Sequence, residues 1–172
     1  MVRLAWRRLT AWVIDWLVIL AWVAVTAAVG VPLYLAGVTA DLGVVALNVV
    51  SAVVVVLPVV VGLARAEASR RQASVGKRAR RLRVVDARTG TGVTFRQALA
   101  RNALKVGLPW TIGHVAVIAL VTDSADGTVA PAVWVVTALA YVIPLIYVIS
   151  LIVGDGRTPY DRVAGTRVVA DE

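Results

Sequence analysis

The sequence predicts an all-α membrane fold: a four-transmembrane-helix bundle with a small cytoplasmic β-hairpin and an amphipathic helix between spans two and three. Hydrophobic residues make up 60% of the 172 residues and charged residues only 16%, whereas a soluble domain is about half apolar and about a quarter charged. Four apolar stretches reach or approach the ~20 helical residues that cross a bilayer. All 18 Lys and Arg residues fall on one side of such an arrangement.

The four predicted spans lie in a single domain, residues 1–172, at about 9–35, 43–64, 106–121 and 132–153. A cleaved signal peptide is the alternative for the first stretch, because basic residues precede it and Val25-Thr26-Ala27 resembles a cleavage site. However, Asp15 lies inside the apolar run, where acids are rare in signal peptides, and the run continues past Ala27. We therefore expect the first span to be retained.

The distribution of charge predicts the orientation of the spans. In the connection after the first span and in the connection after the third, all charged residues are acids. They are Asp41, Asp123 and Asp126. Lys and Arg concentrate in the cytoplasmic loops of membrane proteins. We therefore expect a multi-pass protein of the cell membrane, in which the N- and C-termini and the long connection 65–105 are cytoplasmic.

This connection begins with a basic stretch, since residues 65–83 hold eight basic side chains and a single acid, Glu67. Basic clusters beside a membrane attract anionic lipid head groups by roughly 1 kcal/mol per charge. Nucleic acid is the competing partner, but the interleaved aromatic side chains of a stacking surface are missing. Anionic lipid is thus the expected partner, and nucleic acid is not, for the cluster of Arg70, Arg71, Lys77, Arg78, Arg80 and Arg81.

The rest of the connection predicts short secondary structure. Residues 82–85 and 93–95 are rich in β-branched side chains and flank a Gly-containing turn, which is typical of a β-hairpin. The spacing of Thr94 and Gln97 predicts a capping box that opens an amphipathic helix. Residues 167–171 near the C-terminus repeat most of the sequence of residues 83–87. These two runs could pair as strands, and a third strand would strengthen a marginal hairpin.

Asp15 is the most unusual residue of the sequence, because it lies within an apolar span. A charged side chain at the centre of a membrane helix costs roughly 3 kcal/mol on insertion scales and usually has a partner. Arg8 lies two helical turns earlier on the same face. His114 and Tyr147 lie at one predicted depth, about 13 Å above the cytoplasmic face by helical rise, and are candidates for a proton relay with Asp15. A purely structural role in helix assembly is the alternative.

A short capped helix is predicted near the C-terminus. Thr158 suits its N-cap, Pro159 its first position and Gly165 its end. The cap alone explains an acid at position 161. In addition, Asp161 would lie just below the inner membrane face, where it can pair with Arg8, so that Arg8, Asp15 and Asp161 form a buried polar network.

Several of these segments resemble the pattern of RDD-family membrane proteins, in the order expected for that family. They are Arg8-Leu9-Thr10-Ala11-Trp12-Val13-Ile14-Asp15, Ser74–Arg78, Leu82–Val85, Arg101-Asn102 and residues 161–169. The family is named for one arginine and two aspartates, which the resemblance places at Arg8, Asp15 and Asp161. The resemblance implies an integral membrane protein for which transport has been proposed.

The predicted function is transport of a small solute or ion through or beside the network of Arg8, Asp15 and Asp161. Four short spans enclose little volume, so a homo-oligomer is a candidate for the complete pathway. The alternative is a non-catalytic membrane scaffold, whose basic connection binds anionic lipid or a protein partner. An enzyme is not expected, because no HExxH, GxSxG or P-loop motif occurs. With no cysteine and one histidine, neither a cofactor nor a metal site is expected.

Overall fold

A computed structural model describes residues 2–125, 127–153 and 155–171. Four helical runs in these residues are long and apolar enough to cross a membrane: Leu4–Leu35, Val45–Glu67, Phe95–Asp123 and Pro131–Ile152. The prediction of four apolar helices is therefore confirmed. Asp126, one of the acids used to predict the orientation, lies outside the described residues.

Two of the runs are single helices, and the other two are interrupted by a π-helical turn. In chain order the elements of the runs are α1 (Val2–Leu35), α2 (Val44–Ser51), η1 (Ala52–Val56), α3 (Leu57–Glu67), α5 (Phe95–Asn102), η2 (Ala103–Gly107), α6 (Leu108–Ala125) and α7 (Pro131–Ile152). The predicted amphipathic helix is α5. It continues through η2 into α6, so the third run begins earlier than the predicted span.

In both interrupted runs a proline follows the π-helical turn, Pro58 after η1 and Pro109 after η2. Proline lacks a backbone N–H and clashes with the preceding turn of an α-helix, whereas a π-helical turn shifts the bonding from i→i−4 to i→i−5. At the end of η2 the Leu108 N–H donates to the Ala103 carbonyl. The next bond of this series would join residue 109 to Leu104. Because residue 109 is a proline, the Leu104 carbonyl needs another donor.

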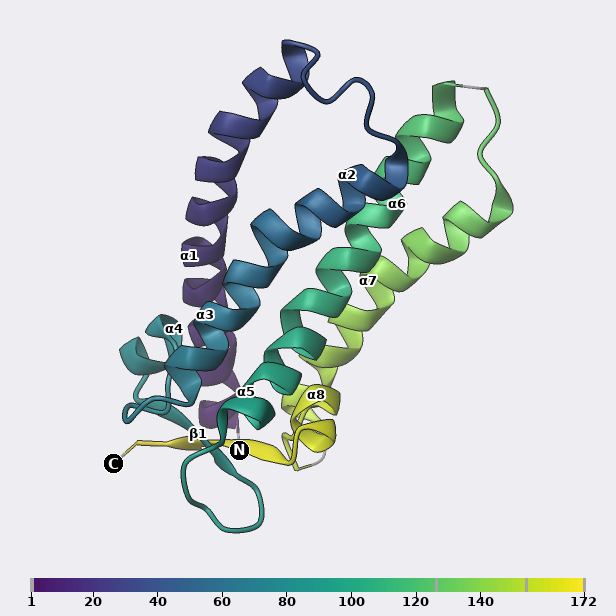
Figure 1. Cartoon of the computed structure of the whole chain (residues 1–172). Coiled ribbons are helices and arrows are strands. Elements are labelled where there is room, and N and C mark those ends of the chain that lie inside the picture. Colours follow the sequence, from purple (N-terminus) through teal and green to yellow (C-terminus); the bar gives the residue numbers. More distant parts are fainter. Residues whose placement is uncertain (1, 126, 154, 172) are drawn as a thin grey trace.

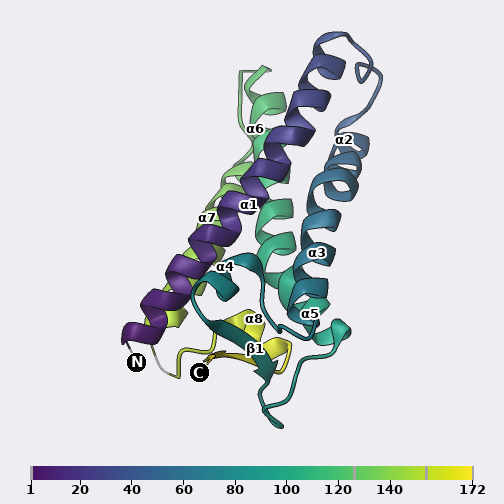
Figure 2. The same ribbon diagram turned by 90° about the vertical axis from the view of Figure 1, so that its left-hand side faces the viewer.

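The short elements gather at one end of the helical runs (Figures 1 and 2). They are α4 (Val75–Ala79), β1 (Leu82–Asp86), α8 (Pro159–Val163) and β2 (Thr166–Ala170). We call this region the basic end, because the connection 65–105 and the C-terminal segment bring their Lys and Arg residues to it. The first turns of α1 also lie there (Figure 1).

The sheet at the basic end consists of two antiparallel strands, in which Val84 of β1 lies opposite Val168 of β2. The partner of β1 is therefore the C-terminal echo of its own sequence. This long-range pairing replaces the hairpin predicted with residues 93–95, of which only an isolated bridge between Val85 and Gly92 is present in the described residues.

The capping box of α5 explains why the second hairpin arm does not become a strand. The Gln97 N–H donates to the Thr94 hydroxyl at 3.2 Å, and the Thr94 N–H donates to the Gln97 side chain at 2.9 Å. These reciprocal bonds satisfy two helix-terminal donors. As a result, Phe95 is the first residue of α5, and the prediction of a capping box is confirmed.

Two clusters of buried apolar side chains pack the first three runs against one another and against the sheet. The lower cluster lies where α1, α3, α5 and the sheet meet and contains Ala11, Ala64, Leu82, Val84, Val93, Ala98 and Val168. The upper cluster joins α1 to both interrupted runs and contains Ile19, Val56, Val60 and Val106. No residue of α7 is fully buried within the part that the structure describes, and α7 packs against α6.

Candidate functional site

Asp161 is fully buried on α8. Its carboxylate accepts four hydrogen bonds, from Arg8 Nη2 at 2.9 Å, Arg101 Nε at 2.8 Å, Thr158 Oγ1 at 2.8 Å and Thr166 Oγ1 at 3.0 Å. Burial alone raises the pKa of a carboxyl group, but the charges of Arg101 and Arg8 hold the pKa of Asp161 below its ordinary value. Asp161 is therefore an anion that ties α8 to α1 and α5. The predicted pair with Arg8 is present.

Arg101 is the central cation of the site and is 1% exposed on α5. While its Nε donates to Asp161, its Nη1 donates to both carboxylate oxygens of Glu67, at 2.7 and 2.8 Å. The guanidinium carbon also lies 5.3 Å from the centre of the Tyr160 ring, a cation–π contact. One guanidinium thus bridges two buried acids, a geometry that the planar fork of arginine suits.

Glu67, the last residue of α3, is fully buried and has two donors besides Arg101. Lys77 Nζ donates to it at 2.7 Å and Asn102 Nδ2 at 2.8 Å. Lys77 also lies 3.6 Å from Asp15. Burial lowers the pKa of Lys77, and the nearby charge of Glu67 only partly offsets this effect. Lys77 therefore links the acid of α3 to the acid of α1.

Asp15 is 3% exposed and lies against the N-terminus of α4. It accepts hydrogen bonds from Ser74 Oγ at 2.6 Å and from the backbone N–H of Gly76 at 2.8 Å. The first N–H groups of a helix have no acceptor within the helix. Asp15 of α1 supplies an acceptor for one of these groups, the Gly76 N–H. The packing is so close that a Cβ atom at Gly76 would lie 2.0 Å from the Ala11 carbonyl oxygen.

These residues form one charge network, which we define as Arg8, Asp15, Glu67, Lys77, Arg101 and Asp161. Ion pairs connect Asp15 to Lys77, then Glu67, Arg101, Asp161 and finally Arg8. The direct contact considered between Arg8 and Asp15 does not occur in the described residues, because α4 inserts Lys77 and the Gly76 N–H at Asp15. The network joins α1, α3, α5 and α8, and α8 follows α7, so the basic ends of all four runs are linked to it.

The sequence model of the RDD family matches residues 2–129. The chain belongs to the RDD family. No curated protein and no solved structure matches it. Within this RDD-family chain the matched region contains five of the six network residues, and Asp161 lies beyond it. The structure joins that later segment to the matched region through Arg8 and Arg101.

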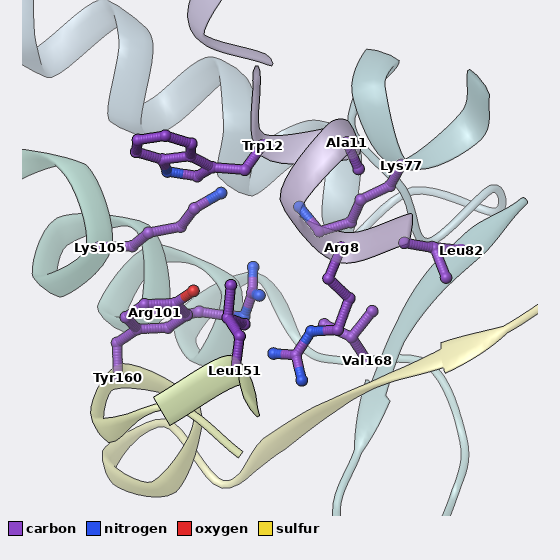
Figure 3. A pocket seen from close by; sticks show the side chains of 10 residues that line it. All are labelled: Arg8, Ala11, Trp12, Lys77, Leu82, Arg101, Lys105, Leu151, Tyr160 and Val168. Carbon is purple, nitrogen blue, oxygen red and sulfur yellow. The ribbon is translucent and has the colours of Figure 1, made fainter. Parts of the chain in front are cut away.

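A small cavity lies beside the charge network (Figure 3). It measures about 30 Å³ and is lined by four cations, Arg8, Lys77, Arg101 and Lys105, together with aromatic and aliphatic side chains. Lys105, in η2, is 8% exposed. No hydrogen bond or ion pair of its ammonium group occurs within the described residues. Those residues also contain no group of three or more His, Cys, Asp or Glu side chains that could hold a metal ion.

The structure does not bring the candidate relay residues to Asp15. The Tyr147 hydroxyl donates to the Leu104 carbonyl at 2.9 Å, and its ring packs edge-on against Tyr160 with centroids 4.9 Å apart. No hydrogen bond joins His114 to Asp15 or Tyr147 in the described part of the chain. Asp15 is bonded by Ser74 and Gly76 instead, because the connection 65–105 folds back onto α1.

The basic cluster divides into exposed and buried members. Exposed side chains that remain candidates for lipid contact are those of Arg70, Arg71, Arg78 and Arg81. Lys77 was grouped with them from the sequence, but it is 5% exposed and belongs to the charge network. Arg80 is half-buried, and its carbonyl accepts hydrogen bonds from Arg7.

Sequence reasoning missed Glu67, Arg101 and Lys105 as site residues and assigned Lys77 to lipid. One signal was available: the stretch 65–83 contains eight basic residues and a single acid, Glu67. A lone acid in such a stretch is the natural counterion for a buried cation. No comparable signal marked Lys105, because a lysine next to a predicted span suits a solvated interface equally well.

Proposed function

We propose that this RDD-family chain is a multi-pass membrane protein that binds and transports a small ion or solute at the charge network. In this proposal the basic end faces the cytoplasm. The observation that carries it is Lys105, a buried lysine whose ammonium group forms no ion pair within the described residues, beside a network whose acids are already engaged. Ionisable groups buried among membrane helices mark ion or substrate pathways by default.

The position of the charge network supports a coupling role. It joins α1, α3 and α5 directly and reaches α7 through α8, so a rearrangement of α1, α3 and α5 relative to one another would strain or exchange its ion pairs. A ligand that replaces a protein partner in the network would favour one arrangement over another. Differential binding of this kind is the requirement for a ligand-driven conformational change.

The test is flux into liposomes that contain the purified protein. We expect uptake driven by a proton, sodium or chloride gradient, and at least a tenfold loss of uptake in Asp161→Asn. Asp155→Asn is the matched control, since Asp155 forms an exposed ion pair with Arg162 outside the network. Only variants that stay folded and monodisperse at the assay temperature are compared. Absence of flux under every gradient would overturn the proposal.

A scaffold is the second candidate function, and the exposed arginines of the basic end favour it. Arg70, Arg71, Arg78 and Arg81 stand outside the charge network and are free to attract anionic head groups. Replacing all four by glutamine should reduce the anionic lipid that copurifies with the protein, as measured by native mass spectrometry. A scaffold loses its lipid shell in this variant, whereas a transporter keeps its flux.

A further inference from the structure

The cavity at the basic end has an unusual lining. Four cations surround about 30 Å³, and no Asp or Glu is among the described residues that line it. Figure 3 shows the nitrogen-bearing ends of Lys77, Arg101 and Lys105 turned toward one space from different elements, with Arg8 beside it. Like charges repel, so such convergence is unfavourable unless negative charge lies among them. Glu67 lies between Lys77 and Arg101, and Asp161 lies between Arg8 and Arg101, whereas Lys105 has no such contact in the described residues.

The charges of the network and of the cavity lining do not balance in the described residues. The cations are Arg8, Lys77, Arg101 and Lys105, and the acids of the charge network are Asp15, Glu67 and Asp161, which leaves one positive charge in excess. Asp86 is a further buried acid, but it accepts hydrogen bonds from Gln97 and from the turn that follows β1.

Lys105 is the cation that accounts for the excess. Asp161 is engaged by two arginines and two threonines, and Glu67 by Arg101, Lys77 and Asn102. Neither acid contacts the Lys105 ammonium group, and Lys105 forms no ion pair within the described residues. An ionised group that is buried without a partner is strongly unfavourable. A ligand that supplies one negative charge would remove this cost.

We infer that the cavity binds a small monovalent inorganic anion of about the size of chloride, with the Lys105 ammonium group as its main contact. The inference rests on the proposed function, because it names the class of ion that the site would carry. Size sets the class: a cavity of this volume holds about one or two water molecules. One small ion matches this volume better than a tetrahedral phosphate with a lipid or nucleotide attached to it.

The remaining walls of the cavity suit an anion. Leu82, Leu151 and Val168 are aliphatic and make the cavity wall less polar. In such surroundings each ion contact is stronger than in water. The Trp12 ring closes another side of the cavity and places a fluorescent side chain within reach of a bound halide (Figure 3).

The first test needs no variant. The unfolding midpoint of the detergent-solubilised protein is measured at constant ionic strength with chloride, bromide, gluconate or sulfate as the anion. We expect a saturable rise of about 3 °C or more when chloride or bromide replaces gluconate at ten times its dissociation constant. Sulfate should not reproduce this rise. A midpoint that does not distinguish chloride from gluconate, or an equal response to sulfate, overturns the inference.

The second test assigns the site to Lys105. Lys105→Met removes the charge and keeps most of the side-chain length, and Arg96→Met is the control, since Arg96 is an exposed cation on the same helical run. The chloride response should vanish in Lys105→Met and persist in Arg96→Met, and line broadening in the chloride NMR spectrum should follow the same pattern. In gluconate, Lys105→Met should be at least as stable as the wild type, because an unpaired charge is gone. A full chloride response in Lys105→Met overturns the inference.

These outcomes separate the inference from the proposed function. Chloride binding without flux under any gradient supports the anion site and rejects transport. Flux of a cation without any chloride response rejects the anion site and leaves transport standing.

Discussion

Gly76 donates its backbone N–H to the Asp15 carboxylate across 2.8 Å and thereby joins the long connection to the first helical run. This bond and the bond from Ser74 explain how an acid is kept among apolar neighbours. A carboxylate that accepts backbone and hydroxyl hydrogen bonds exchanges its lost hydration for fixed dipoles. Asp15 therefore combines two roles: it is the first acid of the charge network, and it anchors α4 to α1.

Gly76→Ala should detach α4 from α1. The added Cβ would lie 2.0 Å from the Ala11 carbonyl oxygen, so backbone on one side must move. We expect a loss of roughly 1–3 kcal/mol in the free energy of unfolding, the usual cost of overpacking. Gly62→Ala in α3 is the control, because no atom lies within 4 Å of its added Cβ. Thermal unfolding in detergent measures both variants. Equal losses in the two would contradict the steric explanation.

Asp161→Asn should destabilise the protein by about 3–5 kcal/mol, because it leaves the buried charges of Arg8 and Arg101 without their shared acid. Asp155→Asn removes an acid whose ion pair with Arg162 has the same 2.8 Å length as a network bond but is exposed to solvent. Exposed pairs contribute less than about 1 kcal/mol. Chemical denaturation of the two variants in one detergent measures the difference. If both substitutions cost the same, burial does not determine the strength of these pairs.

The stability of the protein should fall in acid through Asp161. Its pKa is below the ordinary value in the folded protein, because Arg101 and Arg8 outweigh the opposite effect of burial. A depressed pKa contributes stability that is present above the ordinary value of about 3.9 and disappears as the pH falls toward the folded pKa. The gap in unfolding midpoint between wild type and Asp161→Asn should therefore narrow between about pH 5 and pH 3. A gap that stays constant over this range would contradict the assignment.

The sequence predicted those parts of the fold that depend on local patterns. Apolar length identified the four runs, capping-box spacing identified the start of α5, and the echo between residues 83–87 and 167–171 pointed to the pairing of β1 with β2. Arg8 and Asp161 were also predicted as a pair. Their ion pair spans 153 positions of the chain, and it was found because both residues were expected at the same membrane face.

The rest of the site depends on how the connection folds back, which local patterns do not encode. Lys77 and Arg101 have the sequence surroundings of solvated basic residues, yet both are buried against Glu67. Whether a charge in a connection is exposed depends on long-range contacts of α4 and β1 with α1 and β2. For the same reason the contacts of Asp15 with Ser74 and Gly76 were not predicted.

Tyr147→Phe should destabilise the protein by about 1–3 kcal/mol, because it leaves the Leu104 carbonyl without a donor. Pro109 cannot supply the N–H that would continue the π-helical series to Leu104, and the Tyr147 hydroxyl takes its place. Tyr141→Phe on the same helix is the control, since Tyr141 is 76% exposed. Pro109→Ala restores the missing N–H, so Tyr147→Phe should cost less in that background. Unfolding of the four combinations forms a double-mutant cycle. An unchanged cost in the Pro109→Ala background would mean that the hydroxyl does not substitute for the proline N–H.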